Sequence, residues 1–570
     1  MTINDIKIKI LKKYLVLPVN SRVRDKHITL SDARGDTAFD FDLPLDTINP
    51  KYSSYINVSR FIGDEFEVTV EPEANFSYSF ADSLPAEDDG SNDSISPMNL
   101  NALRPLNVLR PFVHYTVRRG WLSDPNGLFY YGGIYHMMYQ YNPASANWGR
   151  SMHWGHAMSK DLLHWEEDEP VLYPDDMGAM FSGSAWIDSE NASGLKTRED
   201  MPEPILLFYT AAGGVSKQSK EREFTQCAAY SIDGGKSFTK YEKNPIIGNM
   251  VKENRDPRVM YSREIKKYVM LLYMEENSYA LLVSENLLNW EKIQDIELKG
   301  DNECPDFYPL RSSGGEVFWV FSGGSDYYTV GKLTTAGFQP VQTPRPFHFG
   351  GLCSRAGQTF VCADSVSRGS LYGRCIRLVY ENMHMHDCPF ENQIGFPTEM
   401  SLVKIGDIYR LRATPVKEIE LLYEENVSEE NLTVTAFSPY IKRLCTGAYD
   451  ITLRCGFSAC EFELTVFGVT MRISPSKNRL TVENASSTDN GMPLSFSFSG
   501  VEVRILCDTA GIELFAEGGL IYFTCSIQAD FGMSYLKIKP QGDITVDSLK
   551  INRLKSARPQ LKSDTDLLEM

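Results

Sequence analysis

The sequence lacks several features that would point to common classes of protein. No apolar stretch approaches the roughly 20 residues that a membrane-spanning helix needs, and lysines interrupt residues 6–10 too often for the apolar core of a signal peptide. Helical periodicity is scarce along the whole chain. The eleven cysteines include no Cys-x-x-Cys pair. We therefore expect reduced thiols in a cytoplasmic protein rather than a framework of disulfides.

Signals for other chemistries are missing as well. A formal net charge of −18 at pH 7 opposes binding to nucleic acid and to anionic membrane surfaces. There is no His-Glu-x-x-His motif, no phosphate-binding Gly-x-x-x-x-Gly-Lys-Ser/Thr loop and no Gly-x-Gly-x-x-Gly fingerprint. His384 and His386 are interpreted as residues of an exposed loop rather than as metal ligands. An uncharged substrate such as a sugar fits these absences.

The sequence predicts an all-β protein. Residues 1–82 and 430–555 alternate apolar and polar side chains with a period of two, which indicates strands with one buried face. Between them, residues 83–104 are polar and predict a linker, and residues 105–412 are rich in glycine and contain all seven tryptophans. Residues 556–570 are polar and predict a loose tail.

The tryptophan-rich region contains a weak internal repeat. Residues 159–166, Ser-Lys-Asp-Leu-Leu-His-Trp-Glu, return as Ser-Glu-Asn-Leu-Leu-Asn-Trp-Glu at 284–291, with a fainter copy at 231–238. Each copy fits a strand end, an Asx-type turn and an aromatic residue that begins the next strand. Repeats of this kind, tens of residues apart, are typical of the blades of a β-propeller.

Three acidic residues stand in unusual local settings within this region. Asp124 precedes a Pro-Asn-Gly turn, Asp256 precedes a proline, and Glu303 lies in an acidic stretch that ends in Cys-Pro-Asp. Taken singly, each fits an acid that only organises a turn. A glycosidase needs two carboxyl groups across the scissile bond, and a propeller can bring distant acids together near its axis. Their joint occurrence favours a sugar-cleaving site without identifying the sugar.

An ordered series of motifs covers about residues 105–550. It opens at 111–127, which ends in Trp-Leu-Ser-Asp-Pro-Asn-Gly, and continues at 135–143, 147–149, 152–157, 181–185, 255–257, 303–306, 355–360, 389–393 and 508–515. This series resembles glycoside hydrolase family 32, the invertase, inulinase and levanase family. The resemblance implies a five-bladed β-propeller over 105–412 and a β-sandwich over 430–555. Residues 1–82 resemble, more weakly, an accessory β domain of some bacterial levanases.

The resemblance also implies the roles of the three acids. Asp124 would be the nucleophile, Glu303 the general acid/base and Asp256 a stabiliser of the transition state. The glycosidic bond would then be cleaved with retention of configuration, which requires the Asp124 and Glu303 carboxyl groups to lie roughly 5–5.5 Å apart. At that separation the charge on Asp124 favours the protonated form of Glu303.

Other positions are implied by resemblance to contact the sugar or to hold the acids. Gln140, Trp148 and Ser182 would line a fructose pocket, Phe181 would add an apolar wall, and Arg255 would hold the acids in place. No metal or cofactor is implied. The expected partner is a small fructoside or an oligosaccharide, and a homo-oligomer is compatible with the sequence.

Three departures from the family pattern bear on the substrate. Ser123 replaces the usual asparagine before the nucleophile, Arg150 and Ser151 stand where relatives often have Gly-Asn, and Tyr380 lies near the position of a substrate-facing tryptophan. The leading hypothesis is a β-fructosidase acting on sucrose, fructo-oligosaccharides, inulin or levan. A fructosyltransferase is the second, because transferring relatives vary the same box, and a non-catalytic fructan-binding protein is the third.

Overall fold

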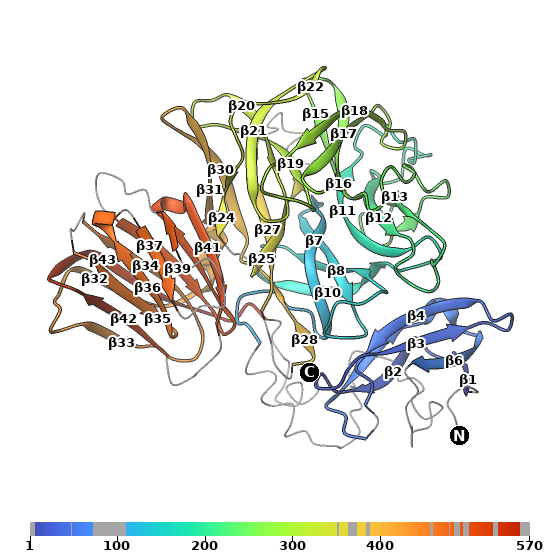
Figure 1. The fold of residues 1–570 in the computed structure, drawn as a ribbon, viewed down its shortest axis with the longest axis horizontal. Coiled ribbons are helices and arrows are strands. Elements are labelled where there is room, and N and C mark those ends of the chain that lie inside the picture. Colours follow the sequence, from blue (N-terminus) through green and yellow to red (C-terminus); the bar gives the residue numbers. More distant parts are fainter. Residues whose placement is uncertain are drawn as a thin grey trace.

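The computed structural model describes residues 6–46, 48–71, 110–349, 353–362, 373–383, 388–456, 460–477, 479–483, 491–493, 501–527 and 534–558. The predicted linker at 83–104, the pair His384 and His386, and residues 559–570 of the predicted tail lie outside this set. The regular elements of the described part are almost all strands, which confirms the all-β prediction (Figure 1). Within it, no helix is long and apolar enough to cross a membrane.

The N-terminal strands form a small packed unit of their own. A four-stranded sheet has the order β1-β6-β3-β4, and β2 pairs with β5. In β6, Phe66, Val68 and Val70 face the core while the intervening residues are more exposed, as the period of two predicts. The elements are β1 (Ile6–Lys9), β2 (Tyr14–Val19), β3 (Lys26–Ser31), β4 (Thr37–Leu43), β5 (Tyr52–Asn57), η1 (Ser59–Phe61) and β6 (Glu65–Glu71).

Five antiparallel sheets of four principal strands follow one another between residues 120 and 415. They are β7 (Gly120–Tyr131), β8 (Ile134–Asn142), β9 (His153–Ser159) and β10 (Trp165–Leu172); β11 (Ala179–Ile187), β12 (Ile205–Ala212), β13 (Phe224–Ser231) and β14 (Thr239–Lys240); β15 (Arg255–Ser262), β16 (Lys267–Glu275), β17 (Ser278–Ser284) and β18 (Glu291–Glu297); β19 (Asp306–Arg311), β20 (Val317–Ser322), β21 (Tyr327–Thr334) and β22 (Gly337–Pro340); and β25 (Ser354–Thr359), β27 (Cys375–Glu381), β30 (Thr398–Ile405) and β31 (Ile408–Pro415).

The first strands of these sheets close a ring. β7 contacts β11, β11 contacts β15, β15 contacts β19, β19 contacts β25, and β25 contacts β7. Short segments from late in the chain, β26 (Val361–Cys362) and β28 (Phe390–Glu391), pair in parallel with β7 and join the last sheet to the first. Two further short strands, β23 (Arg345–Pro346) and β29 (Gln393–Ile394), extend the last two sheets.

The internal repeat of the sequence corresponds to one recurring turn. Asp161, Asp233 and Asn286 each accept hydrogen bonds from backbone N–H groups two to four residues ahead, between the third and fourth strands of the first three sheets. In the two stronger copies the indole of Trp165 or Trp290 donates a 2.9 Å hydrogen bond to the carbonyl three residues before it. The Asx-type turns that the repeat predicts are confirmed.

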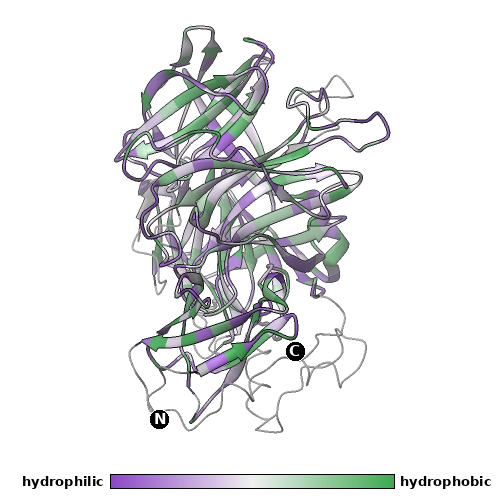
Figure 2. Ribbon diagram, turned by 90° about the vertical axis from the view of Figure 1, so that its right-hand side faces the viewer, coloured by the Kyte–Doolittle hydropathy of each residue, from purple (hydrophilic) through white to green (hydrophobic). Residues whose placement is uncertain are grey.

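The C-terminal strands form two stacked sheets. Their orders are β24-β41-β40-β39-β34-β43-β32 and β33-β42-β35-β36-β37-β38. The elements are β24 (His348–Phe349), η3 (Lys417–Leu422), β32 (Tyr423–Val434), β33 (Tyr440–Arg443), β34 (Ala448–Cys455), β35 (Phe462–Val466), β36 (Val469–Ser474), η4 (Pro475–Lys477), β37 (Arg479–Glu483), β38 (Gly491–Pro493), β39 (Val501–Cys507), β40 (Gly511–Ala516), η5 (Glu517–Gly519), β41 (Ile521–Ser526), β42 (Tyr535–Pro540) and β43 (Ile544–Leu554). Hydrophobic and hydrophilic stretches alternate along the strands of the molecule (Figure 2).

The two-layered unit is packed tightly against the ring of sheets. One continuous apolar core includes Leu378 and Phe396 of the last sheet together with Phe515 and Tyr522 of the C-terminal unit. β24, which follows the fourth sheet of the ring, pairs in parallel with β41 and so belongs to the C-terminal sheet. The C-terminal strands therefore share buried surface with the ring instead of being tethered to it by a flexible linker.

Candidate active site

A small pocket lies where the innermost strands of the ring meet. Four of the five ring sheets and the turn before β19 contribute to its wall, which carries two of the predicted acids. The lining residues are Asp124, Pro125 and Asn126 of β7, Ser182 and Gly183 of β11, Asp256 of β15, Cys304 and Pro305 just before β19, and Ala356, Gly357 and Gln358 of β25.

Asp124 is held at the pocket by polar contacts from two neighbouring sheets. The Ser182 hydroxyl donates a 2.8 Å hydrogen bond to Asp124 Oδ2, and the Cys304 thiol lies 3.4 Å from the same oxygen. Asn126 donates from its amide to the Asp124 carbonyl (2.6 Å) and accepts from the Gly183 N–H (2.9 Å). Burial raises the pKa of Asp124, with a smaller contribution from the charge of Glu303, while the Ser182 and Cys304 donors oppose that rise.

The backbone of β7 is irregular around the acid. The pairing of β7 with β8 is interrupted by bulges on both sides of Pro125 and Asn126. Gly127 has φ of +52°, and a Cβ there would lie 2.9 Å from the Trp154 ring, so only glycine fits. The Pro-Asn-Gly sequence thus places Asp124 at a break in the strand, where its carboxylate is aimed at the pocket.

Asp256 is the more deeply embedded of the two pocket acids. Its backbone has φ of +65°, a left-handed conformation that is rare for aspartate, and its N–H donates to the Thr210 hydroxyl at 3.0 Å. Its Oδ2 accepts a 2.9 Å hydrogen bond from the Cys304 N–H and lies 3.9 Å from Arg255 Nε. Burial raises the pKa of Asp256 to about 6, although the charge of Arg255 opposes this.

Glu303 lies beside the pocket, with a side chain that is 35% exposed. Arg255 Nη2 donates to its Oε1 at 3.1 Å, and Arg355 Nη2 lies 3.7 Å from its Oε2. The Tyr279 hydroxyl donates to the Glu303 carbonyl at 3.2 Å, and the Arg255 guanidinium stacks 4.6 Å above the Tyr273 ring. Glu303 and Cys304 both have positive φ, +55° and +36°. This strained turn directs the glutamate and the thiol to different neighbours.

The structure brings part of the predicted set together. Asp124, Ser182 and Asp256 line the pocket, and Arg255 and Glu303 are linked to it through the contacts above. The remaining predicted residues are not in the described pocket wall: Ser123, Gln140, Trp148, Phe181 and Tyr380.

Each of those five has an identifiable place. Ser123 is buried on β7, next to Asp124 in the irregular part of the strand. Gln140 donates from its buried amide to the Met180 carbonyl. Tyr380 lies on β27 opposite Arg355 of β25.

Aromatic rings lie next to the strand that carries Ser182. Trp148 is 51% exposed and meets Phe181 edge-to-face with ring centroids 6.5 Å apart, and Phe181 meets Phe224 in the same way at 5.7 Å. These rings present an exposed apolar surface of the kind on which sugars stack. The role of Trp148 as a substrate contact stays a prediction.

The N-terminal strands brace the loop that carries Trp148. Asn147 Nδ2 lies 3.4 Å from both carboxylate oxygens of Asp25, and Arg150 Nε lies 3.6 Å from Asp42 Oδ2. Arg150, one of the departures from the family pattern, is therefore ion-paired with the N-terminal sheet.

Sequence reasoning missed four residues of the site. Cys304 contacts both pocket acids, Asn126 connects β7 to β11, Gln358 donates to the Gly183 carbonyl at 3.0 Å, and Arg355 faces Glu303. All four lie inside motifs already recognised at 111–127, 303–306 and 355–360. Burial raises the pKa of the Cys304 thiol well above its usual range, so the thiol remains protonated and acts as a donor.

Comparison with known proteins identifies the family. The sequence model of the glycosyl hydrolases family 32 N-terminal domain matches residues 114–413. The levanase of Bacillus subtilis is 31% identical over 494 residues, which cover 78% of this chain and 70% of the levanase. The chain belongs to glycoside hydrolase family 32. The extracellular exo-inulinase of Aspergillus ficuum is 35% identical over 503 residues, 76% of this family 32 chain and 92% of the inulinase.

Solved structures support the fold of this family 32 enzyme. The exo-inulinase of Aspergillus awamori superimposes with a TM-score of 0.69 at 23% identity, covering 79% of this chain and 99% of the inulinase. The fructan 1-exohydrolase IIa of Cichorium intybus gives a TM-score of 0.64 at 19% identity, covering 79% and 98%. The predicted combination of a β-propeller and a β-sandwich is confirmed, and the chain is a glycoside hydrolase.

Proposed function

We propose that this enzyme releases terminal β-D-fructofuranosyl residues from sucrose, fructo-oligosaccharides or fructans such as inulin and levan, with retention of configuration. The relatives named levanase and exo-inulinase support the substrate class. The observation that carries the mechanism is the pocket itself, in which Asp124 and Asp256 face the same space and share the Cys304 thiol, with Glu303 beside them. The proposal assigns a different task to each acid.

Asp124 is assigned as the nucleophile. Its carboxylate attacks the anomeric carbon of the fructosyl unit, the bond to the leaving oxygen breaks, and Glu303 transfers its proton to that oxygen. Glu303 then takes a proton from water, which attacks the fructosyl-enzyme and frees Asp124. Ser182 donates its 2.8 Å hydrogen bond to Asp124 Oδ2, so Oδ1 is assigned as the attacking oxygen.

Asp256 is assigned as the residue that stabilises positive charge. A second carboxylate at the reaction centre favours the oxocarbenium-like transition state and accepts hydrogen bonds from sugar hydroxyl groups. The Cys304 N–H and Arg255 both contact Asp256 Oδ2 and hold the carboxylate in place. The two arginines around Glu303 set its direction without entering the pocket wall.

Kinetic analysis of two variants tests these assignments. Asp124→Ala is expected to abolish turnover of sucrose and inulin while the circular-dichroism spectrum and melting temperature remain close to those of the wild type. Glu303→Ala is expected to lose about 10²–10⁴-fold in kcat, and less on a fructoside with a good leaving group. Glu253→Gln, at an exposed carboxylate near Arg255, is the matched control. Wild-type activity in Asp124→Ala would exclude the assignment.

Product analysis separates hydrolysis from transfer. A fructosyltransferase uses the same fructosyl-enzyme but passes the unit to a sugar hydroxyl in place of water. We expect chromatography of reactions with sucrose, kestose, inulin and levan to yield free fructose. Longer fructosides accumulating at high sucrose concentration would assign the chain to transfer. Sugar binding with no change of any fructoside would assign it to non-catalytic binding.

A reducing compartment fits the cysteines. Cys227, Cys455, Cys507 and Cys525 are buried thiols, and the Cys304 thiol lies against the pocket acids. Disulfides form and persist in oxidising compartments. We therefore place the enzyme in the cytoplasm, where it would meet imported sugars, and thiol titration of protein freshly released from cells under non-reducing conditions tests this.

A further inference from the structure

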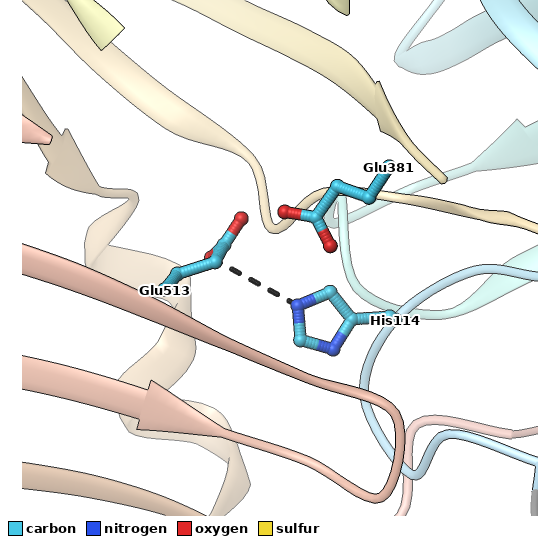
Figure 3. A group of neighbouring side chains, drawn as sticks. All are labelled: His114, Glu381 and Glu513. Carbon is cyan, nitrogen blue, oxygen red and sulfur yellow. Dashed lines mark ion pairs between the residues drawn. The ribbon is translucent and has the colours of Figure 1, made fainter. Parts of the chain in front are cut away.

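A second cluster of ionisable side chains is buried where the ring of sheets meets the C-terminal sheets. His114 lies in the segment before β7, Glu381 ends β27, and Glu513 lies on β40. Their side chains point toward one another from three separate parts of the chain (Figure 3). All three are buried, and one candidate ligand atom from each lies within 4.8 Å of the others. None of them belongs to the pocket around Asp124.

The three atoms that face the centre of this cluster are unsatisfied. His114 Nε2, Glu381 Oε1 and Glu513 Oε2 are fully buried, and none has a hydrogen-bond partner among the described residues. His114 Nε2 and Glu513 Oε2 are 3.8 Å apart. A buried polar atom left without a partner destabilises a fold, because it loses its hydrogen bonds to water. Three such atoms converging on one point indicate that something binds between them.

The opposite atom of each side chain is held by a specific partner. His114 Nδ1 lies 3.0 Å from Asp508 Oδ2, and Glu381 Oε2 accepts a 2.6 Å hydrogen bond from the Gln393 amide.

Glu513 is held in the same way. Its Oε1 accepts from the Tyr522 hydroxyl at 2.9 Å and from the Phe396 N–H at 3.0 Å. Each residue is therefore oriented by one atom and presents the other to the centre. This is the arrangement in which neighbouring groups orient the ligands of a metal ion, with the carboxylate–histidine pair fixing the imidazole tautomer.

We propose that His114, Glu381 and Glu513 bind a divalent metal ion, with Zn²⁺ the best match. One imidazole nitrogen and two carboxylate oxygens are ligands that Zn²⁺ accepts at about 2.0–2.2 Å. Side-chain shifts of less than about 1 Å bring the three atoms to that distance from one centre. A fourth ligand is supplied by water or by the second oxygen of a carboxylate. The ion neutralises two carboxylates that otherwise face each other in an apolar interface.

The role of this metal is structural. The three ligands belong to the segment that leads into the first sheet, to the last sheet of the ring, and to the C-terminal sheets. One ion thus ties the beginning and end of the ring to the β-sandwich. The site and the proposed hydrolysis are independent, because the pocket residues and the metal ligands are different.

One substitution distinguishes the metal site from a metal-free alternative. Without a metal, the pair Glu381 and Glu513 must share a proton, with a charged His114 beside them. Glu381→Gln imitates the protonated acid, so this state predicts that the variant has unchanged stability. The metal site predicts the opposite, because an amide oxygen is a much weaker ligand than a carboxylate.

The experiment measures metal content and stability in the full chain. Wild type and Glu381→Gln are produced in medium with added Zn²⁺, dialysed against a chelator and analysed by plasma mass spectrometry. We expect close to one Zn²⁺ per wild-type chain, at least a tenfold loss in Glu381→Gln, and a lower melting temperature for the variant. Asp326→Asn, which breaks a buried ion pair with Arg377 nearby, is the control that loses stability but retains the metal.

A second measurement uses only the wild type and therefore tests the proposal even if the variant does not fold. Wild type produced in medium depleted of divalent metals is expected to melt at a lower temperature, and added ZnCl₂ is expected to restore the difference. Wild type that holds no divalent metal from supplemented medium, and whose melting temperature is unaffected by ZnCl₂, would overturn the proposal in favour of a shared proton or a bound water molecule. Equal stability of Glu381→Gln and wild type would do the same. Hydrolytic activity is not a readout here, so either result leaves the function of Asp124 untouched.

Discussion

Asp256 shows how the pocket acids work against the stability of the fold. Burial raises its pKa from 3.8 to about 6, so between about pH 4 and pH 6 the folded chain binds more protons at this site than the unfolded chain does. The free energy of unfolding therefore decreases as pH rises through this interval. Above pH 6 the charged carboxylate destabilises the fold by up to about 3 kcal/mol.

Asp256→Asn is therefore expected to stabilise the protein and inactivate it. The amide oxygen can still accept the Cys304 N–H, while the buried charge is gone. Urea unfolding at pH 5 and pH 7.5 should give a larger gain in the free energy of unfolding at pH 7.5, and kcat should fall by orders of magnitude. A variant that is less stable than wild type at pH 7.5 would contradict this account of the site.

Asp124 and Asp256 are together expected to set the acidic limb of the pH profile of activity. The charge of Asp124 contributes to the raised pKa of Asp256, so the limb of kcat/KM belongs to the pair. Activity should fall as pH decreases below about 6. Cys304→Ala removes a donor to Asp124 and should move this limb upward by less than about one pH unit, whereas Cys304→Ser should leave it in place. A limb near pH 4, or one unmoved by Cys304→Ala, would count against the proposed electrostatics.

At the scale of single strands, β7 explains what sequence reasoning could and could not predict. The Asp-Pro-Asn-Gly order pointed to a turn and to a candidate acid, and the structure has a bulged strand with Asp124 at the pocket. Ser123, which was expected to contact substrate, is buried on β7 and is not among the residues that line the pocket, so that contact stays a prediction. Bulges in β7 decide which of its side chains face the pocket. These bulges depend on how β7 pairs with β8, and a local sequence motif does not show that pairing.

The repeated Asx turns could be predicted from local sequence, whereas the cluster of His114, Glu381 and Glu513 could not. The three Asx turns were predictable because all of their hydrogen bonds are local. The contact between His114 and Asp508 joins residues 394 positions apart. Such contacts depend on how the sheets close and pack together, and a single sequence does not show which distant residues will meet.

We expect the N-terminal sheet to shape the rim of the pocket, meaning the loops that surround its opening, by holding the loop between β12 and β13. Asp40 of β4 is almost fully buried and accepts hydrogen bonds from the Lys217 N–H (3.0 Å) and the Gln218 N–H (3.1 Å) of the loop that leads to β13. Asp40→Ala leaves these N–H groups without their acceptor and is expected to lower the free energy of unfolding by about 1–3 kcal/mol. We also expect a higher KM for inulin with a smaller change in kcat.

The control for this change lies on the same hairpin. Asp36 is 70% exposed in its side chain, so Asp36→Ala should stay within about 0.5 kcal/mol of wild type and keep its KM. Calorimetry and initial-rate kinetics on both variants decide the matter. Identical behaviour of Asp40→Ala and Asp36→Ala would show that the N-terminal sheet does not shape the rim.

For the whole molecule, ring closure is the step that creates the site. Asp124 and Asp256 come from two sheets and Cys304 from the turn before a third, and they meet only because the first strands of the five sheets surround one axis. The β-sandwich contributes nothing to the pocket wall but shares a continuous apolar core with the ring. Destabilising that core is therefore expected to affect activity through the fold rather than through the chemistry.

The central claim is that Asp124 forms a covalent bond with the fructosyl unit. Glu303→Ala, given a fructoside with a good leaving group, should form the fructosyl-enzyme and hydrolyse it slowly, because the general base is missing. Rapid acid quenching, proteolysis and mass spectrometry should then find one fructosyl unit on the peptide that contains Asp124. The same unit attached to Asp256 or to any other residue, or turnover with inverted configuration and no adduct, would contradict the mechanism.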